Sequence, residues 1–154
     1  MRIKQSIEQG IYVVLMLALE KEHKPVKSNV LSSILGVSDS YLKKILRKMV
    51  VSGIVTSSAS KDGGYQLARS IEEITLYDIY QSIVESENSI ELSGLAHKIF
   101  VDDEKLKRDE EIVMDAFGNA FHAFNTELKK VHLSELLIKE NYLNGWTEWN
   151  EHVK

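Results

Sequence analysis

Apolar residues recur at intervals of three and four along most of the chain, which is the spacing of amphipathic helices. The first such segment spans residues 4–20, with apolar positions at Ile7, Ile11, Val14, Leu15, Ala18 and Leu19. Pro25 cannot lie inside a helix, so we expect the connection after this helix to end there. A second helix is predicted from Ser28, as its N-cap, to about Leu35.

Residues 29–49, NVLSSILGVSDSYLKKILRKM, have the features of two short helices that cross at a tight turn. Gly36 supplies the positive φ that such a turn needs, and the small Ser32 allows the helices to approach closely. A third helix is expected over 39–51, and its cap is Ser38 or Asp39. This is the layout of a helix-turn-helix, whose second helix enters the DNA major groove.

A β-hairpin is predicted next, around residues 54–68, because two β-prone runs flank the turn-rich segment 59–64. A hairpin directly after a helix-turn-helix is a wing, and Lys61 lies at its tip. The alternative for Gly63-Gly64 is that this pair serves only the turn. The polar face of the third helix is basic, which favours contact with phosphates and base edges, although most charged helix faces are only solvated. The expected DNA-binding residues are Ser28, Ser38, Ser40, Tyr41, Lys43, Lys44, Arg47, Lys48 and Lys61.

Helical spacing resumes over residues 75–85, with Thr75 as cap, and again over 107–131. Residues 87–103 between them are mixed, with a short helix expected around 95–100. The long helix carries an apolar and aromatic stripe that is wide enough to need cover, either from the same chain or from a second copy across a two-fold axis. The expected dimerisation residues are Val113, Phe117, Ala120, Phe121, Phe124 and Leu128.

The chain closes with a short amphipathic helix over 134–142 and a tail that contains both tryptophans. This tail either docks on a partner subunit, covers a pocket or forms a partly ordered end. The predicted fold is mainly α with a small β-hairpin wing. Its expected parts are a winged helix-turn-helix domain at 1–85, a loop or sensor region at 86–106, dimerisation helices at 107–142 and the tail at 143–154.

Charge divides the chain into two unlike halves. Apolar residues make up 44% of the 154 residues, enough for a core, and the net charge is −4. Residues 1–69 hold 11 Lys and Arg against 5 Asp and Glu, a balance of +6, and residues 70–154 hold 8 against 18, a balance of −10. The basic half favours phosphate through counterion release, and the acidic half is expected to face away from DNA. Chance clustering on solvated surfaces is the alternative.

Several classes of site are excluded or disfavoured by residue content. The chain has no cysteine, so disulfides, thiolate metal sites and thiol nucleophiles are excluded. His97 is the one metal-capable nitrogen in the mixed region, and a single histidine beside scattered carboxylates is typical of a surface residue, so we expect no metal and no cofactor. The sequence shows neither a nucleophile–base pair nor a phosphate-binding glycine loop, so we do not expect an enzyme. The apolar run at 11–19 is too short for a membrane span or a signal, so a cytoplasmic protein without a membrane partner is expected.

Two stretches, VSDSYLKKILRKMVVSG and GIVTSSASKDGGYQLARSIEEITLYDI, resemble the winged-helix regulators of the Rrf2 family. The matching pieces are Ser40-Tyr41-Leu42 with Ile45-Leu46, Ser52-Gly53-Ile54-Val55, Gly63-Gly64-Tyr65 with Leu67-Ala68-Arg69, and Ile74-Thr75-Leu76 with Asp78-Ile79. The resemblance is strong over residues 1–85 and extends to the remainder by layout. It implies a homodimeric bacterial transcription regulator, usually a repressor, that reads a roughly palindromic operator in double-stranded DNA.

The chain departs from the family pattern in two places. Cluster-binding members carry three cysteines between the wing and the long helix, whereas residues 85–105 have none, so an iron–sulfur cluster held in the family manner is excluded. Many members begin the wing with Arg-Gly, and here the segment is Ala59-Ser60-Lys61-Asp62, which leaves one lysine for the minor groove, partly offset by Asp62. The alternative function is a winged-helix module for protein contact without DNA. A second alternative is regulation by a small-molecule effector, which would bind in a pocket between the wing domain and the long helix, bordered by residues 85–105 and the tail.

Overall fold

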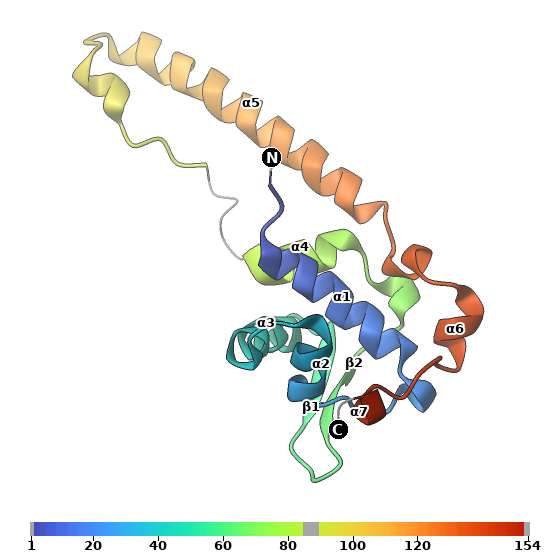
Figure 1. The fold of residues 1–154 in the computed structure, drawn as a ribbon. Coiled ribbons are helices and arrows are strands. Elements are labelled where there is room, and N and C mark those ends of the chain that lie inside the picture. Colours follow the sequence, from blue (N-terminus) through green and yellow to red (C-terminus); the bar gives the residue numbers. More distant parts are fainter. Residues whose placement is uncertain (1, 85–89, 153–154) are drawn as a thin grey trace.

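A mainly helical body carries one β-hairpin, and a long helix extends away from it (Figure 1). The computed structural model describes residues 2–84 and 90–152. Within these residues the α-helices and strands, with the short 3₁₀-helices marked η, are α1 (Gln5–Leu19), η1 (Lys21–His23), α2 (Ser28–Leu35), α3 (Asp39–Val51), β1 (Val55–Ser58), β2 (Gly64–Leu67), η2 (Ile71–Glu73), α4 (Leu76–Val84), η3 (Leu95–Lys98), α5 (Asp103–Lys129), η4 (Leu133–Leu136), α6 (Lys139–Leu143) and α7 (Trp149–His152). The predicted fold class is confirmed.

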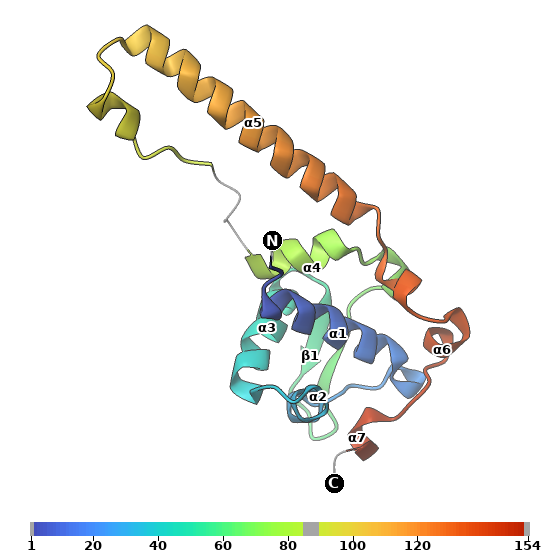
Figure 2. The same cartoon turned by 45° about the horizontal axis from the view of Figure 1, so that its top comes forward.

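The core of the body lies where α1, α2, α3 and α4 meet. α1 and α4 lie side by side in both views (Figures 1 and 2). Gly10 permits this approach, because a Cβ there would lie 2.6 Å from the Ile83 side chain. On α3, the residues with essentially no exposure are Leu42, Leu46 and Met49. This burial fixes the rotation of α3 and turns its polar face outward.

The turn between α2 and α3 follows the sequence prediction in two respects and differs in one. Gly36 takes a left-handed φ of 65°, and Ser38 Oγ accepts a hydrogen bond from the Tyr41 amide at 3.5 Å. The prediction that Ser28 caps α2 is wrong, because α2 begins at Ser28 itself and Lys27 precedes it without a side-chain cap. Ser28 is buried instead, and it contributes to the lowered pKa of Asp39.

The start of α4 is held by reciprocal hydrogen bonds between Thr75 and Asp78. The Thr75 amide and hydroxyl each donate to Asp78 Oδ2 at 2.8 Å, and the Asp78 amide donates to Thr75 Oγ1 at 3.2 Å. Arg69 lies 3.3 Å from the other carboxylate oxygen. Burial by itself raises the pKa of Asp78, but the hydrogen bonds from Thr75 and the Arg69 charge outweigh it and hold that pKa below its ordinary value.

We expect Asp78→Asn to lower the free energy of unfolding by about 1 kcal/mol at neutral pH, because the amide loses the Arg69 ion pair and accepts weaker hydrogen bonds from Thr75 than a carboxylate does. Because the folded pKa of Asp78 is lowered, its stabilisation is complete above the unfolded value near pH ~4 and is lost as the pH falls through the folded value. Denaturant unfolding measured from pH 7 to pH 2 should therefore show that the difference in the free energy of unfolding between wild type and Asp78→Asn decreases as the pH falls. The control is Glu73→Gln, which removes the same charge from an exposed neighbour whose side chain makes no such contacts with the described residues. A difference between wild type and Asp78→Asn that stayed constant with pH would contradict this account.

The second half of the chain differs from the prediction in its boundaries. α5 begins at Asp103, four residues before the predicted start, because Asp102 caps it by accepting from the Lys105 amide at 3.1 Å. The single helix predicted over 134–142 is wrong: η4 and α6 are separated by extended backbone at Leu137. This break lets both Leu133 and Tyr142 reach buried positions. The predicted helix over 75–85 ends within the described residues at Val84, and position 85 lies outside them.

Candidate nucleic-acid interface

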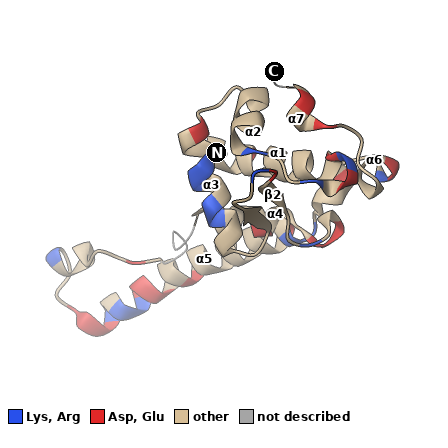
Figure 3. Cartoon of the chain, turned by 90° about the horizontal axis from the view of Figure 1, so that it is seen from below, with Lys and Arg blue, Asp and Glu red and all other residues tan. Residues whose placement is uncertain are grey.

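The outward face of α3 is a row of exposed residues opposite its buried stripe. Because α3 has 3.6 residues per turn, the positions that point away from Leu42 and Leu46 are those about half a turn removed. These positions hold Ser40, Lys44, Arg47 and Val51, all exposed. Two cations and a hydroxyl thus share one surface with an exposed apolar residue at its end. Figure 3 shows the basic bands on α3 and the acidic residues gathered mainly along the N-terminal half of α5 and near the tail.

Lys43 and Lys48 lie on the two flanks of this face and have partners within the chain. Lys43 Nζ lies 2.8 Å from Asp39 Oδ2, and this contact lowers the pKa of Asp39 and raises that of Lys43. Lys48 Nζ donates to the Ile83 carbonyl oxygen at 3.0 Å, in the last turn of α4, where a cation complements the helix dipole. Lys48 is therefore directed toward α4, which differs from its predicted place on the DNA-facing surface.

The remaining predicted DNA contacts divide by exposure. Ser38, Tyr41 and Lys61 are exposed, Lys61 in the turn of the hairpin. The Ser38 and Ser40 hydroxyls lie 3.0 Å apart at the N-terminal end of α3. Ser28 is buried, so the structure does not place it on the outward face.

Asp39 has a structural role that the sequence analysis missed. Besides Lys43, its carboxylate accepts a hydrogen bond from Ser32 Oγ at 3.5 Å, and Ser28 also contributes to the lowered pKa of Asp39. These contacts join the first turn of α3 to α2. An acidic residue next to a helix cap, with two serines at helical spacing upstream, is the sequence signal from which this role could have been inferred.

The wing is held against the body by its glycine pair. β1 and β2 pair antiparallel in the register Val55↔Leu67 to Ser58↔Gly64. Tyr65 continues the pairing on the other side, exchanging backbone hydrogen bonds of 2.8 and 2.9 Å with Val26 just before α2. A Cβ at Gly64 would lie 2.6 Å from the Val26 carbonyl oxygen, so Gly64 permits this close approach. Gly64 therefore does more than form the turn, because it also permits the backbone pairing of the wing with Val26 at the entrance to α2.

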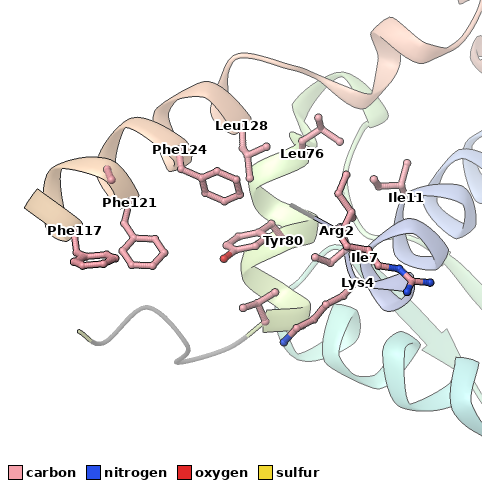
Figure 4. Close-up of a pocket in the computed structure, with 13 residues that line it drawn as sticks. Arg2, Lys4, Ile7, Ile11, Leu76, Tyr80, Phe117, Phe121, Phe124 and Leu128 are labelled. Atoms are coloured by element: carbon pink, nitrogen blue, oxygen red, sulfur yellow. The ribbon is translucent and has the colours of Figure 1, made fainter. Parts of the chain in front are cut away.

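A second surface, an apolar groove, lies between α1, α4 and the C-terminal half of α5 (Figure 4). Its volume is about 570 Å³. Aromatic rings line one wall, and Phe124 packs edge-on against Tyr80 with ring centroids 5.1 Å apart. Five of the six predicted dimerisation residues line this groove: Phe117, Ala120, Phe121, Phe124 and Leu128. The sixth, Val113, lies further out on α5 and is 41% exposed.

The exposed apolar stripe continues beyond this groove along α5. Phe117, at the outer end of the groove, is 57% exposed, and Ile112, beyond it, is 63% exposed. Packing within the same chain thus covers Phe124, but it leaves the outer half of the apolar stripe exposed. The described residues that border the groove come from α1 and its N-terminal approach, α4 and α5, and neither residues 90–105 nor the tryptophan tail is among them. These borders differ from the predicted ones.

The chain is similar to helix-turn-helix transcriptional regulators along nearly its whole length. The family model Rrf2, described as iron-dependent transcriptional regulator, matches residues 3–139. The HTH-type transcriptional regulator YffB of Lactococcus lactis is 29% identical over 152 residues, 97% of each chain. A crystal structure of a transcriptional regulator from Lactobacillus plantarum superposes with a TM-score of 0.66 at 20% identity over 97% of each chain. CymR of B. subtilis, a global cysteine regulator, superposes with a TM-score of 0.62 at 20% identity over 88% of this chain and 95% of its own. At these identities the two structures show the fold alone.

The residues present do not fit the iron that the family description names. Across residues 2–84 and 90–152, no group of three or more His, Cys, Asp or Glu is arranged to hold a metal ion. His97 Nδ1 lies 4.0 Å from Asp103 Oδ1, and both side chains are exposed. The sequence also lacks the cysteines that would hold a cluster. In the described part of the chain, no helix combines the length and the apolar character that crossing a membrane requires.

Proposed function

The chain belongs to the Rrf2 family of DNA-binding transcriptional regulators, which are not enzymes, and from this we propose that it is a homodimeric repressor of a palindromic operator. In this proposal α3 lies in the major groove of double-stranded DNA and the wing lies over the adjacent backbone. The observation that carries it is the row of Ser40, Lys44 and Arg47 on the exposed face of α3, beside a wing that Gly64 fixes to the body.

The basic residues divide into two roles by position. Lys44 and Arg47 point outward from α3 and would contact base edges and phosphates in the groove. Lys43, held by Asp39, and Lys61, in the turn of the wing, are both exposed and would contact phosphates. Repression follows if the operator overlaps a promoter, because the bound protein then excludes polymerase.

The apolar groove supports the dimer. A stripe that leaves Ile112 and Phe117 more than half exposed on a helix projecting from the body is large for a monomer surface. If α5 of a second copy lay in the groove between α1, α4 and α5, the same contact would be repeated by symmetry. In the proposal the two α3 helices of this dimer face one side of a duplex, which requires an inverted repeat. This assignment gives the groove to the partner helix rather than to a small-molecule effector.

Selection of bound sequences from a random duplex pool at ~150 mM salt tests the proposal. The expected result is an inverted repeat whose half-sites lie about 10 base pairs apart or a multiple of that spacing. Enrichment of a single half-site would contradict the dimeric reading. Absence of any salt-dependent binding would favour the alternative of a winged-helix module for protein contact.

A further inference from the structure

The connection between α1 and α2 contains an unfavourable backbone turn. We call residues 20–27 the elbow. Within it, Glu22 and His23 have φ values of 56° and 49°, and they are the only non-glycine residues with positive φ in the described chain. Side chains with a Cβ rarely adopt this left-handed region, and consecutive residues in it persist only where the surroundings hold them there.

The C-terminal segment 142–152, which we call the strap, supplies those surroundings. In Figure 1 it passes from α6 across the end of α1 to α7 beside α2. Its hydrogen bonds to the elbow and to Leu19 include Trp146 N to Leu19 O (2.7 Å), Lys21 N to Thr147 O (2.8 Å), Glu22 N to Asn144 O (3.2 Å) and the His23 ring to Tyr142 O (2.8 Å). Both left-handed residues are therefore bonded to the strap. Gly145 makes the close approach possible, because a Cβ there would lie 2.3 Å from the Glu20 carbonyl oxygen.

The end of the strap is anchored by Trp149 and Glu20. Glu20 is 1% exposed, and its Oε2 accepts from the Trp149 amide at 2.9 Å. The Trp149 indole donates to the Met16 carbonyl oxygen at 2.7 Å, so the residue holds both α1 and the elbow. Burial raises the pKa of Glu20, and the Trp149 hydrogen bond opposes this change.

Asn150 extends the contact to the first helix of the helix-turn-helix. Its amide nitrogen donates to the Pro25 carbonyl oxygen at 3.1 Å, and its Oδ1 accepts from the amide of Lys27 at 3.4 Å. Lys27 immediately precedes α2, and its side chain makes no capping hydrogen bond. The strap therefore contacts the N-terminus of α2 directly.

We propose that Trp149 and Asn150 are positioning residues for DNA binding, because the strap holds the elbow in its unfavourable turn and thereby sets where α2 lies against α1. α2 is joined to α3 through Ser32 and Asp39, so a shift of α2 moves the DNA-facing helix. The inference rests on the proposed function for its DNA readout. The strap lies outside residues 3–139, over which the family model matches.

The test compares Trp149→Ala with Trp146→Ala in the full-length protein. Trp146 is 64% exposed, whereas Trp149 packs against the core. Both variants therefore remove a tryptophan side chain, but only Trp149→Ala removes the one that anchors the strap. Affinity for the selected operator should fall about tenfold for Trp149→Ala, equivalent to the loss of one good contact, and change less than about twofold for Trp146→Ala. Affinity for unrelated DNA and the dimer mass should not change. Equal operator affinity for the two variants would overturn the proposal.

Asn150→Ala is the second variant, because Asn150 is exposed and its loss does not disturb the core. It should lower operator affinity about threefold and increase amide hydrogen exchange in residues 20–31. The hydrogen-exchange measurement needs no DNA, so it tests the contact between strap and elbow separately from the proposed DNA-binding function. If wild type fails to bind any DNA but exchange still rises, the proposed function has failed and the strap contact stands; unchanged exchange would reject the strap.

A covalent restraint distinguishes positioning from stability alone. The chain has no cysteine, and Glu20 pairs with Thr147 as neighbouring parallel strands do, which brings Lys21 and Glu148 opposite one another. Lys21→Cys with Glu148→Cys in the Trp149→Ala protein should form a disulfide on oxidation. Oxidation is expected to restore operator affinity to within about twofold of wild type, and reduction to remove it again. A disulfide that forms without restoring affinity would contradict a positioning role.

Discussion

Replacing Lys44 and Arg47 together with alanine is expected to weaken operator binding at least about 100-fold at ~150 mM salt. Both side chains lie on the outward face of α3, and the dimer would lose four of them. Contacts of this kind contribute about 1–3 kcal/mol each, so a 100-fold loss is a conservative expectation. If each side chain neutralises one phosphate, the slope of log affinity against log salt should fall by about 3.6. Fluorescence anisotropy at several salt concentrations measures both quantities.

The matched control is the double variant Lys107→Ala with Arg108→Ala. It removes the same two charge types from an exposed stretch of α5, away from α3. Its operator affinity should stay within about threefold of wild type, because distant exposed charges are screened at this salt concentration. If the two double variants lost affinity equally, net charge rather than α3 would account for binding, and the assignment of α3 would fail.

Phe117→Asp is expected to convert the dimer to a monomer, raising the dimer dissociation constant about a thousandfold. Phe117 is 57% exposed in the single chain, so an aspartate there can remain solvated in the monomer. In the proposed dimer each copy would bury that charge among the rings of the groove, where no cation of the described lining lies beside Phe117 (Figure 4). Sedimentation equilibrium should give twice 17.5 kDa for wild type and 17.5 kDa for the variant.

Ile138→Asp provides the comparison for this prediction. Ile138 is 65% exposed and lies in the break before α6, outside the lining of the groove. We expect the Ile138→Asp protein to remain dimeric with wild-type operator affinity.

Phe117→Asp should lose operator binding together with the dimer, because each half-site contact alone is weak. A Phe117→Asp protein that stayed dimeric would place the two-fold interface elsewhere.

Local signals in the sequence were sufficient to predict the helix-turn-helix. Gly36, Ser38 and the apolar spacing of α3 act over a few residues, and helical periodicity alone turns Lys44 and Arg47 outward. The wing was predicted for the same reason, from a turn-rich segment between two β-prone runs. These features depend on backbone conformation and on the period of the helix, which neighbouring residues determine.

The features that the sequence did not reveal depend on contacts between distant parts of the chain. Lys48 is directed to α4 by a carbonyl 35 residues away, so nothing near Lys48 in the sequence distinguishes it from Lys44. The Trp149 indole bonds to Met16 at a separation of 133 residues, and the tail could be read only as several alternatives. The position of Gly64 against Val26 likewise appears only once the wing and the start of α2 are brought together. The early start of α5 at Asp103 is different, because the Asp102 cap before it is a local signal from which the start could have been predicted.

The most direct test of the central claim is site-specific cross-linking from α3 to the operator. Ser40→Cys introduces the only thiol in a chain without cysteine, at an exposed position near the N-terminal end of α3, where recognition helices contact bases. A photoreactive group on this thiol should cross-link to major-groove bases at two positions related by the operator's two-fold axis, and Glu111→Cys on α5 should give no cross-link. Cross-links from Glu111→Cys but not from Ser40→Cys, or cross-links at one unrepeated position, would contradict a dimer that reads DNA through α3.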